Sequence, residues 1–448
     1  MRKKERITNL NQLTQYFEKQ RKSVDDLKVG VEIEKLGVFS RDGKAVPYYD
    51  EGGIESLLRL MNEKYGWEII DEDGEIIALV RKGAFINLEP GGQLELSSLH
   101  QRRIANFAED FDTYIKEIKG VSKDFNIRFL GLGLQPFSSE SDIKWIPKGR
   151  YKIMSPYLQE KGKLSHEMMK LTAAIQATYD YTSEEDAMDK LRVSMGISSF
   201  VTAMIANSPI TEGKPNGFMS RRAYIWLNTD PDRCGLIRGA LSQDFGFNDY
   251  VEYVANVPMM FIKREGKWIP FYGITFKNYI EKGYKGYFPT LEDWELHLTT
   301  IFTEVRIKQY LEVRGSDAPP PRLILSIPTL LKGILYNHES RNAAWRLVKD
   351  FRWEERLKLQ RDVSKYALDA KVKNNKVLDL AKELIAISKE GLKGEIRRKN
   401  HDEDESKYLS SLEELIFEEE TCPAALLMKE WERGLKRDPK KLIEYCSY

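Results

Sequence analysis

The chain has 448 residues, of which 42% are hydrophobic, 11% aromatic and 31% charged, a composition that predicts a folded globular protein and excludes a disordered chain. Its 70 basic and 69 acidic residues leave a formal net charge of +1, which excludes a strongly basic nucleic-acid-binding protein but not a local basic pocket for a polyanion. Three cysteines, Cys234, Cys422 and Cys446, are too few for a disulfide framework or an all-cysteine zinc site.

The N-terminal segment MRKKERITNLNQ is charged and has no apolar region of the kind that a secretory signal requires. No later stretch approaches the ~18 consecutive apolar residues of a membrane-spanning helix. We therefore expect a soluble protein of the cytoplasm that does not bind membranes.

The first part of the chain is predicted to alternate helices with strands. A helix over residues 10–22 precedes a strand over residues 28–39, where side chains alternate with the period of two that is typical of a strand. A helix over residues 53–65 follows, and then strands near residues 68–70 and 76–80, separated by a turn rich in Asp and Gly.

Two further strand segments, residues 84–89 and 93–97, flank Pro90-Gly91-Gly92, so they form either a strand pair or one bent strand. A long amphipathic helix over residues 99–125 and a strand over residues 127–134 come next.

In the second half, residues 168–181 are predicted as a strand, residues 184–206 as a helix and residues 310–314 as a strand. From about residue 322 the pattern is almost all helix, with the charge-dense residues 389–406 as an exposed connection. Helices that lie between and after strands of the antiparallel type favour an α+β fold over a doubly wound parallel sheet.

We see no internal repeat and no long linker, so we expect one domain over residues 1–448. It would contain a sheet-bearing core in residues 1–320 and a mainly helical part in residues 321–448.

Glu32 and Glu34 lie two residues apart on a predicted strand, so their carboxylates project from one face, roughly 6–7 Å apart along the chain. A solvated face of the sheet would explain the pair. A site for a hard cation would also explain it, because Mg2+ takes carboxylate oxygens and keeps substrate phosphates among its other ligands.

Glu89 and Glu95 lie in strand segments that are otherwise apolar, where a carboxylate is costly unless it is paired or bound to a metal. Gly91 and Gly92 between them allow a tight bend or the close approach of a ligand. A plain hairpin remains the alternative to a ligand site.

Glu312 and Arg314 share a strand face, and Glu304 and Arg306 repeat the same spacing. An ordinary ion pair is one interpretation. The other is phosphoryl transfer, in which a carboxylate-bound metal and a guanidinium both neutralise charge on the moving phosphoryl group.

Short basic segments at residues 147–151 and at Arg221-Arg222 could hold a carboxylate, which arginine binds in a bidentate manner, or could be surface charges. The sequence contains no phosphate-binding G-x-x-x-x-G-K-[ST] motif. Cys234 has no histidine nearby in sequence, so we do not expect it to be a nucleophile.

Together these segments resemble the glutamate–cysteine ligase family, also called γ-glutamylcysteine synthetase, of the plant and proteobacterial type. The resemblance covers roughly residues 28–320 and is loose in the C-terminal quarter. Its segments are Gly30-Val-Glu-Ile-Glu34, Leu88-Glu-Pro-Gly-Gly-Gln-Leu-Glu-Leu-Ser97, Gly131-Leu-Gly-Leu-Gln-Pro136, Pro147-Lys-Gly-Arg-Tyr151, Ala206-Asn-Ser-Pro-Ile-Thr-Glu-Gly-Lys-Pro-Asn-Gly217, Asp293-Trp-Glu-Leu-His-Leu-Thr-Thr-Ile-Phe302 and Glu304-Val-Arg-Ile-Lys-Gln-Tyr-Leu-Glu-Val-Arg-Gly-Ser-Asp317.

The resemblance implies a single catalytic domain with a fold like the core of glutamine synthetase, in which the concave face of a curved, mostly antiparallel sheet holds Mg2+ and ATP and helices cover the outer face. It implies that ATP phosphorylates the γ-carboxylate of L-glutamate and that the amine of L-cysteine then displaces phosphate, the first step of glutathione biosynthesis. Mn2+ would be an alternative to Mg2+, and the protein would be a monomer or a weak homodimer.

By the family pattern, Arg314 and Glu312 would be catalytic, with Arg314 on the transferring phosphate, and Arg150 and Arg222 would bind the substrate glutamate. The implied metal ligands are Glu32, Glu34, Glu89, Glu95 and Glu312.

Three positions depart from the plant pattern: Tyr224 stands in place of His, Met260 in place of a Tyr near the substrate, and Thr178 in place of Asn. Tyr224 and Met260 are therefore expected in the substrate-binding region. These changes leave the phosphoryl chemistry intact but leave the amine open. A related ATP-dependent ligase that joins glutamate to another amine, and a non-catalytic member of the family, remain alternatives.

Overall fold

The computed structural model describes residues 5–399 and 404–448. Within these residues, nine strands form one sheet in the order β14-β15-β7-β1-β5-β4-β3-β2, with β6 paired to the far end of β1. Every pairing in this sheet is antiparallel. The strands are β1 (Val29–Phe39), β2 (Glu68–Glu72), β3 (Glu75–Arg81), β4 (Ala84–Leu88), β5 (Leu94–Ser97), β6 (Ile127–Leu130), β7 (Ala174–Tyr179), β14 (Val305–Ile307) and β15 (Leu311–Asp317).

Short two-stranded pairs lie outside this sheet: β8 (Ile210–Thr211) with β9 (Lys214–Pro215), β10 (Cys234–Gly235) with β13 (Phe302–Thr303), β11 (Phe261–Arg264) with β12 (Lys267–Pro270), and β16 (Lys371–Val372) with β17 (Asn375–Lys376). The helices are α1 (Asn11–Glu18), α2 (Ile54–Tyr65), α3 (Ile104–Ser122), α4 (Tyr151–Lys161), α5 (Ser165–Leu171), α6 (Glu184–Met204), α7 (Arg221–Trp226), α8 (Phe247–Asn256), α9 (Phe276–Lys282), α10 (Leu291–Leu298), α11 (Ser326–Leu335), α12 (His338–Val348), α13 (Trp353–Tyr366), α14 (Val377–Lys399), α15 (Ser410–Glu413), α16 (Pro423–Arg433) and α17 (Pro439–Cys446).

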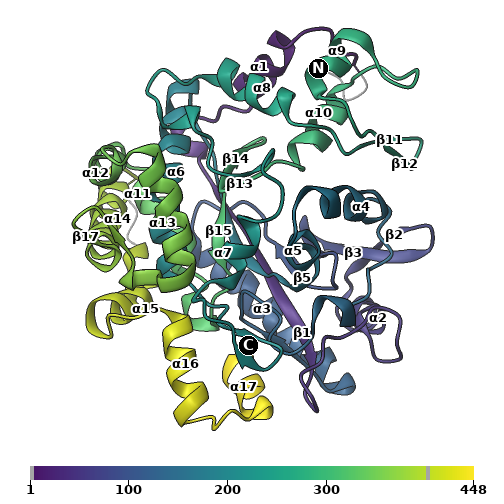
Figure 1. Ribbon diagram of the computed structural model, residues 1–448, viewed down its shortest axis with the longest axis vertical. Coiled ribbons are helices and arrows are strands. Elements are labelled where there is room, and N and C mark those ends of the chain that lie inside the picture. The colour runs from purple at the N-terminus through teal and green to yellow at the C-terminus, as the bar shows by residue number, and fades with distance from the viewer. Residues whose placement is uncertain (1–4, 400–403) are drawn as a thin grey trace.

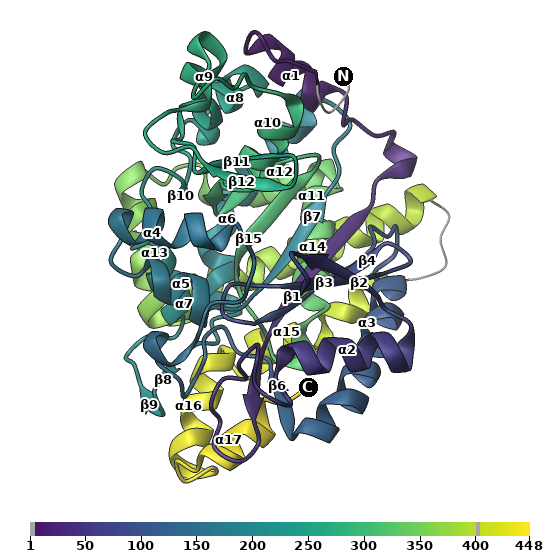
Figure 2. The same cartoon turned by 90° about the vertical axis from the view of Figure 1, so that its right-hand side faces the viewer.

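The helices are arranged on both sides of the central strands. Figure 1 shows α6 and the C-terminal helices α11 to α14 on one side, and α4 and α5 on the other. Figure 2 shows β1 crossing the molecule diagonally, with α2 and α3 near its lower end. Because α6 packs on β15 and α11 packs on β7, that face of the sheet belongs to the core. The α+β prediction is confirmed.

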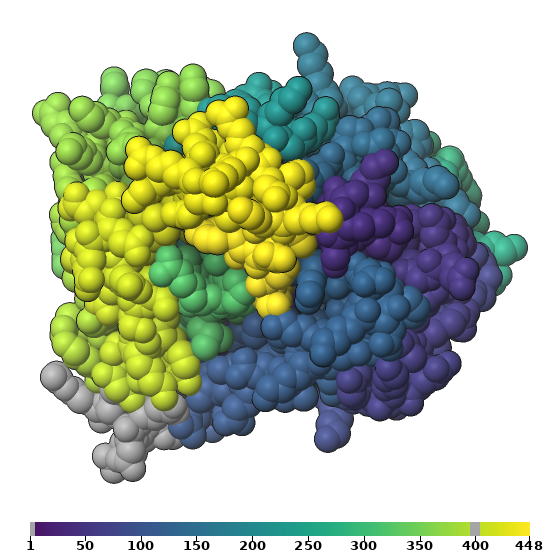
Figure 3. All heavy atoms as spheres, turned by 90° about the horizontal axis from the view of Figure 1, so that it is seen from below, coloured from purple at the N-terminus to yellow at the C-terminus, as the bar shows by residue number. Residues whose placement is uncertain are grey.

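The C-terminal segment packs on residues from the first third of the chain. Ser447 pairs with Leu130 at the end of β6, and the amide of Tyr448 donates to the carbonyl of Phe129 at 3.1 Å. Figure 3 shows this C-terminal surface lying against segments of the first third. The buried Trp431 of α16 joins a second, smaller core with the end of β1. The prediction of one domain over the whole chain remains a prediction.

Two predicted segments differ from the structure. Residues 168–181 are not one strand, because α5 runs to Leu171 and β7 begins only at Ala174. The helix ends where the hydroxyl of Thr172 donates to the carbonyl of Met168 at 2.6 Å, which turns the chain into the sheet.

Residues 389–399 are not a connection between helices but the last turns of α14. The hydroxyl of Ser388 donates to the carbonyl of Leu330 at 2.8 Å, and Gly391 lies against Gly333, so this end of α14 packs closely on α11. Charge density misled the prediction, because a packed helix can carry its charges on the opposite face. Residues 400–403 lie outside the described residues.

Three predicted elements are shorter in the structure than in the sequence pattern. The helix over 10–22 ends at Glu18, the helix over 99–125 begins at Ile104, and the strand over 127–134 ends at Leu130. None of the helices in the described ranges combines the length and apolarity that a membrane crossing needs.

Candidate active site

A cavity of about 270 Å³ opens on the face of the sheet that α4 and α5 overlie. Four glutamates line it: Glu32 and Glu34 from β1, Glu89 after β4, and Glu95 from β5. The other polar residues that line it are Asn87, Gln93, Lys148, Arg150, Tyr151, Thr172, Gln176, Arg222, Thr299, Arg306, Lys308 and Arg314, and the apolar ones are Pro90, Met154, Met168, Met169, Trp226 and Phe302.

The sheet register brings the glutamates together. Glu34 of β1 lies directly opposite Glu95 of β5, and Glu32 lies opposite Gln176 of β7. Because Glu32 and Glu34 are two residues apart on one strand, both point to the same face, as the alternation predicted.

Hydrogen bonds hold two of these carboxylates. Glu34 accepts from the amide of Ala174 at 2.7 Å and from Nε2 of Gln176 at 3.1 Å. Glu95 accepts from Nδ2 of Asn87 at 3.0 Å and from the hydroxyl of Ser97 at 2.9 Å. The orientation of each carboxylate is therefore set by neighbouring strands.

Burial and mutual repulsion act on the same glutamates. Desolvation, then the charges of Glu95 and Glu312, raise the pKa of Glu32 to about 7. Desolvation and the charges of Glu89 and Glu95 raise the pKa of Glu34 well above its usual range. Burial and the charge of Glu89 also raise the pKa of Glu95. This wall of the cavity thus holds more negative charge than its surroundings balance, and oxygen donors of this kind fit a hard cation such as Mg2+. No three acidic, histidine or cysteine side chains within residues 5–399 and 404–448 are already arranged as a metal site, so the glutamates would have to turn to share an ion.

Glu312 has different surroundings from the other four glutamates. It is fully buried and does not line the cavity, and it pairs with Lys308 at 2.6 Å, with Arg306 at 2.8 Å and with Arg314. Although burial alone would raise its pKa, the three cations hold the pKa of Glu312 well below its usual range. The structure thus keeps the Glu312 carboxylate out of the cavity lining, although its charge still acts on Glu32, one of the other predicted metal ligands. Instead, it places Glu312 under a basic cluster whose members face the cavity.

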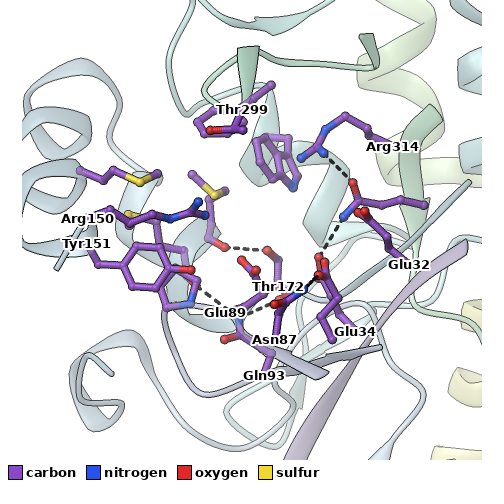
Figure 4. A pocket seen from close by; sticks show the side chains of 18 of the residues that line it. Glu32, Glu34, Asn87, Glu89, Gln93, Arg150, Tyr151, Thr172, Thr299 and Arg314 are labelled. Atoms are coloured by element: carbon purple, nitrogen blue, oxygen red, sulfur yellow. Dashed lines mark hydrogen bonds between the residues drawn. The ribbon is translucent and has the colours of Figure 1, made fainter. Parts of the chain in front are cut away.

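Arg314 connects this basic cluster with the acidic wall. Its Nη1 donates to Oε1 of Gln176 at 2.5 Å, and the amide nitrogen of Gln176 donates in turn to Glu34. Figure 4 shows Arg314 and Arg150 pointing into the cavity from opposite sides, with Glu89 between them. A ligand in the cavity would meet guanidinium groups on two sides and carboxylates on a third.

Arg150 and Arg222 both line the cavity with donors to spare. Arg150 lies directly before α4, and Arg222 lies in the first turn of α7, where its Nη2 donates to the carbonyl of Arg314 at 3.0 Å. The Nε atoms of Arg150 and Arg222 are buried and have no hydrogen-bond partner among the described residues. A buried donor without a partner is costly. A bound carboxylate or phosphate would accept hydrogen bonds from these donors and remove that cost.

Tyr224 and Met260 do not lie at this cavity. Tyr224 is on α7 but packs against Phe218 with tilted rings at a centroid distance of 4.6 Å, and Met260 is buried beside β11. Thr178 also lies away from the cavity, where its hydroxyl accepts from the amide of Gly30 at 3.1 Å. The departures from the plant pattern therefore fall outside the residues that line the site.

Sequence reasoning missed several residues at the cavity. Gln176 and Asn87 are single amides in strands, and nothing in the sequence separates them from structural amides. Gln93 lies in the glycine-rich segment, where its amide nitrogen donates to the carbonyls of Met169 and Thr172. Lys148 lies within the basic segment at residues 147–151 that the sequence analysis singled out, and its charge was a usable signal. Lys308 lies within the family segment of residues 304–317 but was not singled out.

Cys234 is half-buried and unpaired, and burial raises its pKa to about 12. It is therefore a thiol at neutral pH and does not line the cavity.

The arrangement of an acidic wall facing arginines suits a ligase that activates a carboxylate, and the comparisons with known proteins give the family. The chain matches the family model described as glutamate-cysteine ligase family 2 (GCS2) over residues 28–440. It belongs to that family and is a ligase.

Curated relatives agree with this assignment. The chain is 38% identical over 374 residues to glutamate–cysteine ligase B, chloroplastic, of Oryza sativa subsp. japonica, covering 83% of this chain and 75% of that protein. It is 36% identical over 422 residues to glutamate–cysteine ligase, chloroplastic, of Arabidopsis thaliana, covering 93% and 79%. A solved glutamate–cysteine ligase of Francisella tularensis in complex with AMP shares the fold, with a TM-score of 0.57 at 12% identity over 94% of this chain and 87% of that one.

The expected cytoplasmic location is wrong, because the plant relatives named above are chloroplastic proteins. The cytoplasmic location was expected because the N-terminal segment has no apolar region. That observation argues only against a secretory signal. Segments that direct import into plastids are amphipathic and rich in Ser and Arg, so hydropathy does not detect them.

Proposed function

We propose that this ligase joins the γ-carboxylate of L-glutamate to the amine of L-cysteine at the cost of ATP, through a γ-glutamyl phosphate, as the first step of glutathione biosynthesis. One observation carries the proposal: a single cavity is lined by four glutamates and by four arginines, Arg150, Arg222, Arg306 and Arg314. The family and the names of the relatives support the two amino acids, and the AMP in the Francisella protein supports the nucleotide.

We assign different roles to the arginines of the cavity. Arg150 and Arg222 have unused buried donors and are the groups that we assign to the carboxylates of glutamate. Nη1 of Arg314 contacts both Gln176 and Glu312, so this end of its guanidinium is positioned before substrate arrives. A fixed cation stabilises the transition state without the cost of reorganising at the moment of reaction.

The acidic wall is the part of the site that we assign to a divalent cation, held by Glu32, Glu34, Glu89 and Glu95. Mg2+, or Mn2+ in its place, would neutralise charge on the nucleotide phosphates when bound. Glu312 is better suited to hold Arg306, Lys308 and Arg314 in place, because its carboxylate is already paired with all three.

The order of the chemistry follows from the leaving groups. A carboxylate is a poor electrophile, so its oxygen must first be converted into phosphate, which leaves readily when the amine attacks. Arg314 would bear the charge of the transferring phosphoryl group, and the amine would lose its proton as it forms the amide. No cysteine nucleophile is available for a covalent route, since the Cys234 thiol is protonated and outside the cavity.

The test is a coupled assay of phosphate release with ATP, Mg2+ and L-glutamate across a panel of amines. We expect L-cysteine to give the highest kcat/KM and a product of the mass of γ-glutamylcysteine. Faster turnover with another amine would assign a different acceptor, and no release with any amine would contradict the proposal. In gel filtration we expect a monomer or a weak homodimer.

A further inference from the structure

We propose that Glu72 is a positioning residue, whose carboxylate fixes the loop that carries Lys148 and Arg150 into the cavity. The inference rests on the proposed function, in which Arg150 binds a carboxylate of the substrate glutamate. Glu72 itself does not line the cavity.

Glu72 is the last residue of β2, next to an exposed turn, yet its side chain is only 13% exposed. Its Oε1 accepts two hydrogen bonds, from the amide of Gly149 and from Nε1 of Trp268, each at 2.9 Å. The ammonium group of Lys263 lies 3.8 Å from Oε2. Hydrogen bonds to a carboxylate are about twice as strong as those between neutral groups, so this acceptor fixes its donors firmly.

The bonded amide is that of Gly149, the residue between Lys148 and Arg150. A side chain at this glycine would force Glu72 or Trp268 to move, because a Cβ there would lie 2.3 Å from Oε1 of Glu72 and 2.5 Å from Cδ1 of Trp268. The backbone thus approaches the carboxylate as closely as glycine allows. Fixing this peptide fixes the direction in which Arg150 leaves the chain.

Arg150 has few other restraints of its own. Its guanidinium lies 5.1 Å from the centre of the Tyr151 ring, and its Nε has no partner among the described residues. The loop before it therefore contributes to the direction in which the guanidinium points, together with Tyr151 and the first turn of α4. A loose loop would cost binding, because an arginine must present its planar fork in one orientation to a carboxylate.

Trp268 brings a second element to the same carboxylate. It lies on β12, its ring packs edge-on against Phe261 at 5.1 Å, and Lys263 lies over it at 4.8 Å. Figure 1 shows the start of α4 between the β11–β12 pair and the β2–β3 pair. Glu72 thus joins two hairpins on either side of the loop that carries Arg150.

A clasp that only stabilises the fold would lower the melting temperature and affect both substrates alike. A positioning residue for Arg150 would act on glutamate alone. Because Arg150 would bind glutamate equally in the ground and transition states, its misplacement should raise KM and leave kcat nearly unchanged.

The experiment compares Glu72→Ala, Glu72→Gln and the control Glu75→Ala in the full chain. Glu75 lies on the same hairpin, and its carboxylate accepts from the hydroxyl of Tyr49 at 3.2 Å, away from the cavity. We expect Glu72→Ala to raise KM for glutamate about tenfold, which corresponds to ~1.4 kcal/mol, with KM for ATP and kcat changed less than twofold. Glu72→Gln keeps an oxygen acceptor for both donors, so it should stay within about threefold of the wild type, and Glu75→Ala should match the wild type.

An unchanged KM for glutamate in Glu72→Ala would overturn the proposal. So would an equal rise in the KM values of glutamate and ATP together with a lower melting temperature, since that result would make Glu72 a structural clasp. If the wild-type protein releases no phosphate in a glutamate-dependent manner, the proposed function fails, and this inference fails with it. That result is distinguishable because it appears before any variant is made.

Discussion

Glu34 and Glu95 lie directly opposite each other on the antiparallel strands β1 and β5, so that two buried carboxylates occupy one cross-strand position. Like charges opposite each other destabilise a sheet. The chain also surrounds this pair with Glu32 and Glu89 instead of separating the charges. In the proposed function, a bound divalent cation neutralises this concentrated negative charge.

The first prediction concerns pH and the metal-free protein. Because the pKa of Glu32 is raised from 4.5 to about 7 in the folded state, the folded protein binds this proton more tightly than the unfolded chain does. The stabilising contribution is therefore complete below pH 4.5 and is lost as the pH rises through about 7. Urea unfolding of the wild type and Glu32→Gln between pH 5 and 8 should show a steeper loss of stability for the wild type. If the free energy of unfolding changes equally with pH in the two proteins, Glu32 does not have the raised pKa on which this prediction rests.

The second prediction concerns the cation itself. Metal binding requires ionised carboxylates, so Mg2+ should raise the melting temperature more at pH 8 than at pH 6. Chelation should abolish activity, and added Mg2+ or Mn2+ should restore it. The matched control is Glu34→Gln together with Glu95→Gln, which should lose most of the thermal shift. An equal shift in the wild type and this variant would place the cation elsewhere.

The third prediction concerns Arg314. Arg314→Lys keeps the charge but loses the planar fork that contacts Gln176 and Glu312. If Arg314 stabilises the transferring phosphoryl group, kcat should fall roughly a hundredfold, about 3 kcal/mol, while KM for glutamate changes much less. Steady-state kinetics check this directly. Near-normal turnover would exclude Arg314 from the phosphoryl-transfer step.

The fourth prediction concerns two of the three positions that depart from the plant pattern. Because Tyr224 and Met260 lie outside the cavity, Tyr224→His and Met260→Leu should leave the ranking of amine substrates unchanged and alter KM for cysteine less than about threefold. The measurement is kcat/KM across the same panel of amines. A change in the preferred amine would show that these residues reach the substrate after all.

Much of the sheet could be predicted from the sequence because one face of each strand has a clear chemical character. In β1, the apolar Val31 and Ile33 face the core, and Glu32 and Glu34 face the cavity, which gives the period of two. Even Lys35 follows this pattern. It is fully buried on the core side, where its ammonium lies over Tyr114 at 4.5 Å.

What the sequence could not provide depends on contacts between distant segments. The division between α5 and β7 is set where Thr172 turns the chain, and a run of apolar residues reads as helix or strand equally well. The low pKa of Glu312 depends on its pairing with Arg306, Lys308 and Arg314. The contact of Gln176 with Arg314 depends on the pairing of β7 with β15. Spacing along the chain shows that two side chains share a face. It does not show which group from a distant segment forms a hydrogen bond or an ion pair with them.

The proposed function depends on one step, the phosphorylation of the γ-carboxylate of glutamate in this cavity before the amine attacks. It is tested most directly with L-glutamate labelled with 18O in the γ-carboxylate, incubated with ATP, Mg2+, L-cysteine and the protein. The account predicts that each phosphate released carries one 18O atom from glutamate, as mass spectrometry of the phosphate would show, and that Arg314→Lys slows the transfer without changing its one-to-one ratio. Release of phosphate that contains no 18O from glutamate would contradict the account.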